Sequence, residues 1–226
     1  MAGVSGFDGF GVAALDFYED LEDDNSKAFW TAHKQVYDDQ VRAPMLALLE
    51  LLEPEFGTGK AFRPYRDVRF SKDKTPYKTH QGAFVARGDA TGFYVEVNAA
   101  GVRVGAGCYR LSGATMQRYR DAVDDDRLGG ELETIVTRIR AQGYELGGER
   151  MRTRPRGVSA DHPRLELMRN RGLSAGRSYG SEPWVHSGQL ADRVAGDWRA
   201  LVPLVDWMAD HVSSPSPAAA PDAAAP

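Results

Sequence analysis

The chain has 226 residues, of which 42% are apolar and 10% are aromatic, and its formal net charge at pH 7 is −4. This length and composition suffice for one large domain with a hydrophobic core. A run of about 18 apolar residues and a signal-peptide pattern are both missing, which excludes a membrane-spanning helix and predicts a soluble, cytoplasmic protein without a membrane partner.

The first part of the chain is predicted to be helical. Apolar residues recur at spacings of three and four between about residues 12 and 52, as in two or three amphipathic helices. Asn25 and Ser26 predict an N-cap for the second of these helices. Residues 53–57, which include Pro54 and Gly57, then end the helical region.

The middle and the end of the chain predict strands followed by further helices. Short segments rich in aromatic and β-branched residues, separated by turn residues, predict consecutive antiparallel strands at residues 61–70, 82–87, 93–98 and 102–109. Helical spacing then predicts a helical pair at 114–143, a short helix at 162–169 and a closing helix at 190–208. We therefore predict an α+β fold, with an antiparallel sheet of about four to six strands flanked by N-terminal and C-terminal helices and covered mainly on one face.

Residues 7–212 are predicted to form a single domain. Residues 1–6 are small and are expected to be frayed. Residues 213–226 contain four prolines and no large apolar side chain, so we expect a disordered tail.

The segment 63–80 carries six Lys or Arg and two Asp residues, although the whole chain is acidic. Such a local positive field is typical of a site for an anionic partner. In an extended segment Arg63, Asp67 and Arg69 would share one face, with Asp67 orienting the two guanidinium groups for a phosphate or carboxylate. The alternative is a solvated ladder of ion pairs, and the sequence leaves both open.

A second basic run occupies residues 150–156. Its arginines would point the same way in an extended chain, so something negative is expected to face them. That partner is either an acidic stretch of the same chain, at 16–24 or 121–126, or an anion shared with the first segment across one cleft. The candidate ligand-binding residues are Arg63, Arg66, Arg69, Ser71, Lys72, Lys74, Tyr77, Lys78, Arg154 and Arg156.

Two histidines and one aspartate are candidate catalytic residues. His80 and His162 each lie beside a basic run and are candidate proton carriers, together with Asp67, although a partly buried hydrogen-bonding role is the more common one for such a His. The five histidines lack metal-ligand spacing, so we predict no metal unless Asp67, Asp161 or Glu96 converges with one of them. The single cysteine, Cys108, excludes an internal disulfide and a cysteine-based metal cluster.

We predict no cofactor. The glycines of residues 101–107 are not followed by the helix of a dinucleotide-binding fingerprint, so this segment is interpreted as a strand with glycines for close packing.

The segment Arg-Asp-Val-Arg-Phe-Ser-Lys-Asp-Lys-Thr-Pro-Tyr-Lys-Thr at 66–79 resembles the hallmark of a family of bacterial and fungal proteins known as domain of unknown function 2461. Further similarity covers residues 25–30 with His33 and Tyr37, residues 101–109, residues 154–157 with 161–163, and residues 203–204 near Trp207. The chain departs from the family at Phe29 and Trp30, where homologues usually have an aromatic residue and then Phe. The resemblance implies one α+β domain in which both basic runs are characteristic parts, and it implies no activity.

We expect an uncharacterised protein whose basic cleft binds an anionic small molecule, as a receptor or as an enzyme. One alternative is a nucleic-acid-binding module in which Tyr65, Phe70 and Tyr77 stack on bases, against which the acidic net charge weighs. Another is a scaffold that docks an acidic partner protein. The sequence does not choose between these alternatives, nor does it give the oligomeric state.

Overall fold

The structure is a computed structural model that describes residues 6–69 and 71–213. Its first section is helical, as predicted, and Ser26 caps the second helix by accepting a hydrogen bond from the Phe29 amide at 3.1 Å. A π-helical segment continues that helix into the third. The elements are α1 (Val12–Asp23), α2 (Lys27–Val36), the π-helical segment η1 (Tyr37–Arg42) and α3 (Ala43–Phe56).

An antiparallel sheet of six strands follows, in the order β1-β2-β3-β4-β6-β5. The fold is therefore α+β, as predicted. The strands are β1 (Gly59–Ala61), β2 (His80–Gly88), β3 (Thr91–Asn98), β4 (Gly101–Cys108), β5 (Glu145–Gly147) and β6 (Leu173–Gly180).

The predicted strand at 61–70 is wrong over most of its length. The chain leaves the sheet after Ala61 and forms a loop that pairs with itself, through hydrogen bonds from the Arg66 amide to Pro76 O and from the Lys78 amide to Pro64 O. Proline lacks the N–H that a strand donates, which explains why the segment around Pro64 does not continue the ladder.

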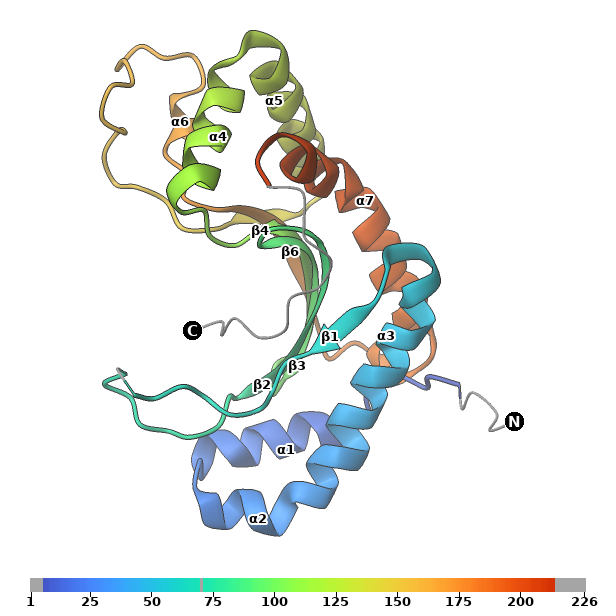
Figure 1. Ribbon diagram of the computed structural model, residues 1–226. Coiled ribbons are helices and arrows are strands. Elements are labelled where there is room, and N and C mark those ends of the chain that lie inside the picture. Colours follow the sequence, from blue (N-terminus) through green and yellow to red (C-terminus); the bar gives the residue numbers. More distant parts are fainter. Residues whose placement is uncertain (1–5, 70, 214–226) are drawn as a thin grey trace.

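The remaining helices complete the fold, and α7 is the closing helix that the sequence predicted. Figure 1 shows a curved sheet with α1, α3 and α7 against one face, whereas α4, α5 and α6 lie beyond one end of the sheet. These elements are α4 (Gly113–Asp124), α5 (Asp126–Ala141), α6 (Leu165–Met168), the 3₁₀ segment η2 (Pro183–His186) and α7 (Gln189–His211). No helix in the described residues is long and apolar enough to cross a membrane.

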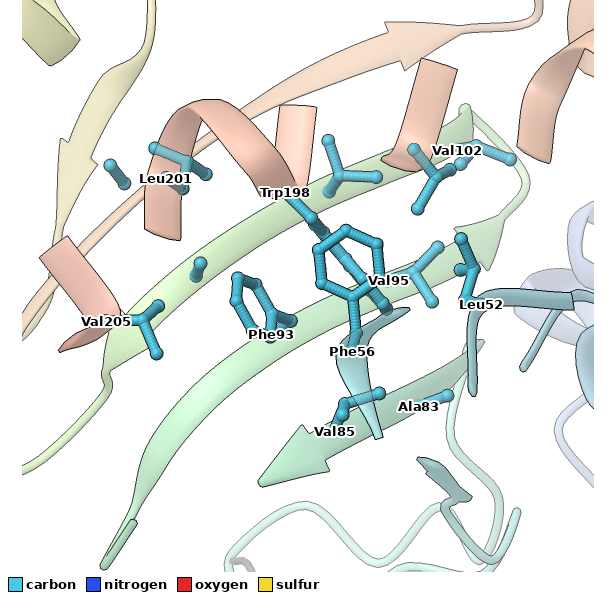
Figure 2. Packing of buried hydrophobic residues seen from close by; sticks show 14 of the residues in the cluster. Leu52, Phe56, Ala83, Val85, Phe93, Val95, Val102, Trp198, Leu201 and Val205 are labelled. Carbon is cyan, nitrogen blue, oxygen red and sulfur yellow. The ribbon is translucent and has the colours of Figure 1, made fainter. Parts of the chain in front are cut away.

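The core lies between the sheet and these helices. Figure 2 shows Phe93 and Val95 of β3 beneath Trp198 of α7, with Phe56 of α3 beside them. The rings of Phe56 and Phe93 lie 5.2 and 5.3 Å from the ring of Trp198, which is fully buried. Burial of such side chains stabilises the fold by about 1.5–3 kcal/mol each.

The folded part extends to the end of the described residues. Ser213, which was included in the predicted tail, is within hydrogen-bond distance of Thr91 Oγ1 at 3.2 Å, and Val212 is fully buried. The rest of the predicted tail, residues 214–226, and residues 1–5 lie outside the described residues.

Candidate functional site

The sheet face that points away from α7 carries polar side chains, and we call it the uncovered face. Val95 and Val97 are buried toward the helices, so the alternating residues of β3 point the other way. Glu96 lies opposite Gly82 of β2 and Arg103 of β4, and His80 lies opposite Asn98. The uncovered face comprises His80, Gly82, Phe84, Tyr94, Glu96, Asn98, Arg103 and Gly105.

Glu96 is the centre of the hydrogen bonds on this face. The Tyr94 hydroxyl donates to Glu96 Oε2 at 2.5 Å, and Asn98 Nδ2 donates to Glu96 Oε1 at 3.4 Å. Burial, with the neighbouring Glu96 carboxylate, raises the pKa of Tyr94, which therefore remains a donor at neutral pH. The carboxylate is held in place and stands across the strand pair from the exposed Arg103.

Three basic groups meet where the loop joins β2. Burial lowers the pKa of Lys78, and the Arg63 guanidinium lowers it further. Burial also lowers the pKa of His80; the Glu96 carboxylate opposes that effect and Lys78 adds to it. The charge of Arg63 thus acts on Lys78 and that of Lys78 on His80, which indicates a local positive potential at the edge of the uncovered face. The ammonium of Lys78 also lies 5.3 Å from the ring centre of Phe62.

The loop of residues 62–79, which we call the basic loop, is fixed to the N-terminal helices. The side chain of Asn25 bonds both backbone groups of Tyr77 at 3.1 Å, and the Tyr77 ring stacks on Trp30 with 4.2 Å between centroids. Tyr77 is only 5% exposed. The sequence placed Tyr77 among the ligand-binding residues, whereas the structure uses its ring as an anchor.

Two arginines of the basic loop are paired with carboxylates of the same loop. Arg66 binds Asp73 and Thr75, and Arg69 binds Asp67 with Nε–Oδ1 at 2.9 Å and Nη2–Oδ2 at 2.6 Å. The hydrogen bonds from Arg69 lower the pKa of Asp67 to about 2, and the charge of Arg63 has a smaller effect in the same direction.

Asp67 therefore orients Arg69, but among the described residues it has no hydrogen bond to Arg63. Its low pKa makes it a poor general base near neutral pH.

The tip of the basic loop is held by backbone contacts. Lys74 donates to Val68 O at 2.9 Å, and the Ser71 amide is bonded to the same oxygen at 3.4 Å. Lys72 is exposed. Phe70, which we considered as a base-stacking residue, lies outside the described residues.

The second basic run is not the extended stripe that the sequence predicted. Its backbone is held by Arg169, which donates to Met151 O at 3.1 Å and to Arg152 O at 2.6 Å. Arg150 pairs with Glu166, and Arg154 Nη1 lies 3.4 Å from Val158 O. In the part of the chain that the structure describes, Arg152, Arg154 and Arg156 form no ion pair with a carboxylate.

Among the described residues, the acidic stretch 121–126 contacts His162 and Arg164, and not the second basic run. His162 Nε2 lies 2.9 Å from Asp124 Oδ1, and its Nδ1 accepts a hydrogen bond from the Arg164 amide at 3.0 Å. The buried Arg164 bonds Val123 O at 2.7 Å and Asp126 Oδ1 at 3.0 Å. Both ring nitrogens of His162 are thus engaged at the junction of α4 and α5, so its geometry is that of a structural residue.

The two basic runs lie on the same side of the sheet, at opposite ends of its curve. In Figure 1 the basic loop projects near α1 and α2, while the loop that includes residues 150–164 projects beside α4 and α6. No hydrogen bond or ion pair between described residues joins the two runs. A cleft shared by both stays a prediction.

The uncovered face also carries polar residues that lie outside both basic runs, namely Tyr94, Glu96 and Arg103. Their signal in the sequence is strand alternation, because Tyr94, Glu96 and Asn98 alternate with buried residues. Among the described residues, no three His, Cys, Asp or Glu side chains are grouped as metal ligands.

Comparison with known proteins identifies one family. The model of the conserved hypothetical protein family DUF2461 matches residues 13–207, a span that includes the uncovered face and both basic runs. A search of curated proteins finds no match.

Proposed function

The chain belongs to the DUF2461 family of conserved hypothetical proteins, and we propose that it binds a small anionic molecule, carrying a phosphate or a carboxylate group, on the uncovered face. The observation that carries this proposal is the group Lys78, His80 and Arg103 around Glu96, on a sheet face whose central strands no helix of the described residues covers. Solvated sheet faces are commonly polar, but the partial burial of Lys78 and His80, together with the charge of Arg63 near Lys78, favours an anion.

Two glycines lie among the polar residues of the uncovered face. Gly82 and Gly105 occupy the positions beside Glu96 and Tyr94 on the neighbouring strands. Glycine in a strand interior is typical of a place where a ligand approaches the backbone closely. The Tyr94 hydroxyl already occupies the space above Gly82, since a Cβ there would lie 2.6 Å from it. A Cβ at Gly105 would lie 3.0 Å from Ala175 O, so this glycine lets the backbones of β4 and β6 pack closely.

The roles of the remaining candidates follow from their partners. Arg63 and Lys78 would hold the anion directly, and Arg69 would approach it while held by Asp67. Arg154 and Arg156 would contribute from the opposite end of the curved sheet. If the bound molecule is turned over, His80 is the proton carrier best placed for it, because it is neutral near pH 7 and neighbours Glu96.

The nucleic-acid alternative has less support. Stacking on bases requires exposed rings, and of the three aromatic residues considered only Tyr65 is described as exposed, at 49%. Oligonucleotides are therefore an arm of the test below. A short RNA or DNA that binds more tightly than phosphate-bearing small molecules would favour the alternative.

The test is a thermal-shift and calorimetric titration of the whole chain with inorganic phosphate, citrate and short oligonucleotides. We expect phosphate or citrate to raise the melting temperature, and Lys78→Gln and Arg103→Gln to weaken binding by about tenfold each. Arg87→Gln is the matched control, because Arg87 lies at the other end of β2 and pairs with Asp206 of α7. Equal weakening in all three variants, or no effect of any anion, would overturn the proposal.

A further inference from the structure

A second candidate site lies on the other side of the sheet, between β6 and α7. A cavity of about 460 Å³ is lined there by both elements and by Trp184 of η2. Arg177 pairs in register with the buried Val104, so its side chain is on the helix side and not on the uncovered face. A volume of this size is in the range of small-molecule sites.

Asp197 of α7 organises one wall of this cavity. It accepts hydrogen bonds from the hydroxyls of Tyr144, at 2.6 Å, and Tyr179, and Arg177 Nε lies 3.7 Å from its Oδ1. Burial, together with the hydrogen bond to Asp197, raises the pKa of Tyr144 to about 12. Both tyrosines therefore remain protonated donors, and the carboxylate is occupied by groups of the protein itself.

Two arginines lie over aromatic rings at the cavity. The Arg177 guanidinium lies 3.8 Å from the ring centre of Tyr144, and that of Arg193 lies 4.2 Å from the ring centre of Trp184. Arg177 Nη2 donates to Gln142 O, but its Nε is buried without a hydrogen-bond partner. Within the described residues Arg193 has no hydrogen bond or ion pair. Stacking orients both guanidinium groups and leaves donors of each unused.

The charges do not balance inside this group. The cavity lining contains two guanidinium groups, those of Arg177 and Arg193, but only one carboxylate, that of Asp197, which pairs with Arg177. We propose that the cavity binds a small molecule with an oxyanion group, a carboxylate or a phosphate, through Arg193 and Arg177. This site is separate from the one proposed on the uncovered face, and neither depends on the other.

The experiment follows the Trp184 indole N–H by two-dimensional NMR during titration with benzoate, inorganic phosphate and neutral benzamide. Trp184→Phe assigns the signal. We expect saturable shifts of the Trp184 signal with benzoate or phosphate and none with benzamide, and the preferred anion distinguishes the carboxylate from the phosphate source. Phosphate bound at the uncovered face would leave this signal unchanged, so the two proposals fail independently.

Two variants remove the site by different means. A Cβ at Gly196 would have no atom within 4 Å, so Gly196→Leu places its side chain in the cavity without a backbone clash, and helix propensity favours the change. Arg193→Gln removes one charge and the guanidinium donors while keeping a polar, though shorter, side chain. We expect each to weaken anion binding at Trp184 by about tenfold or more.

Arg199→Gln is the control, since it changes the charge of α7 equally but pairs with Glu55 away from the cavity. The proposal is wrong if no anion shifts the Trp184 signal, or if the folded Arg193→Gln variant binds as well as the Arg199→Gln control.

Discussion

The two basic runs resemble each other in sequence, but the structure uses their charges differently. In the basic loop, Arg66 and Arg69 are paired with carboxylates of the loop itself. In the second run, Arg150 pairs with Glu166 of α6, and the nearby Arg169 holds the backbone of the run. Part of the positive charge of each region therefore stabilises the conformation of that region.

This difference teaches which cations are available to a ligand. A basic run does not contribute all its charges to a site, because a loop without regular backbone hydrogen bonds needs side chains to hold its shape. The charges that remain are Arg63, Lys72 and Lys78 in the basic loop and Arg152, Arg154 and Arg156 in the second run. This subset, and not the total charge, is the relevant one for anion binding.

The largest expected effect is on the free energy of unfolding, and it distinguishes a buried structural arginine from one that remains free to bind a ligand. Arg164 is 8% exposed and bonds the carbonyls of Val123 and Asp124 as well as the exposed Asp126 carboxylate, so Arg164→Met leaves both carbonyls without this donor. We expect the free energy of unfolding in urea to fall by about 3 kcal/mol. Arg156→Gln, in the same region, should change it by less than about 0.5 kcal/mol. Similar losses in both variants would show that the division between the two kinds of arginine is wrong.

A smaller effect is expected where the basic loop is anchored. Asn25→Ala removes the two hydrogen bonds to the Tyr77 backbone and should lower the free energy of unfolding by about 1–2 kcal/mol. Because the loop loses these hydrogen bonds to the N-terminal helices, trypsin should also cleave faster after Lys72 or Lys74. Gln35→Ala, on the exposed side of α2, is the control and should affect neither measurement. Unchanged cleavage would mean that the Tyr77 ring alone fixes the loop.

Whether the two runs serve one ligand can be tested by a double-mutant cycle. Lys78→Gln and Arg156→Gln are made singly and together, and the affinity for tripolyphosphate is measured by calorimetry. If one polyanion contacts both runs, the two changes should be coupled by about 0.5 kcal/mol or more. Strict additivity would assign the runs to separate ligands and end the model of a shared cleft.

The smallest effect concerns the titration of His80. Its pKa lies below the ordinary value of about 6.5, so the folded protein binds fewer protons here than the unfolded chain. The stability from neutral His80 is therefore present above about pH 6.5 and is lost as the pH falls below that value. His80→Gln should reduce this pH dependence. In NMR titrations, phosphate should raise the pKa of His80, and a pKa that phosphate leaves unchanged would place the anion elsewhere.

Much of the fold could be predicted from the sequence because its apolar periods are strong. The helices before residue 57, the strands β2 to β4 and the helices α4, α5 and α7 follow from spacing alone. Strand β6 was not predicted, since Leu173–Gly180 consists mainly of small and polar residues and becomes a strand by pairing with β4.

The candidate site was predictable only in part. Residue types located the basic runs and His80. The pair of Asp67 with Arg69 could also be predicted, because the two residues are only two positions apart. The burial of Tyr77 against Trp30 and the use of acidic residues by Arg164 depend on segments about 40 or more residues apart. Such long-range partners are set by the packing of the whole chain, so a single sequence does not reveal which charges they neutralise.

The π-helical segment Tyr37–Arg42 lies within the helical region that precedes the basic loop, and it makes the position of this loop depend on the length of that region. Each π-helical turn holds an additional residue, so removal of one residue with the wide turn kept would rotate one side of the helix relative to the other by about 100°. Tyr37 would then lose its hydroxyl contact with Gln81 Oε1, now 2.6 Å, while the Nε2 of the same amide binds Phe62 O at 2.8 Å. The wider turn thus sets the orientation of Tyr37 relative to Gln81, and through Gln81 the position of Phe62, the first residue of the loop. A chain shortened there would have to hold the start of the loop by other contacts.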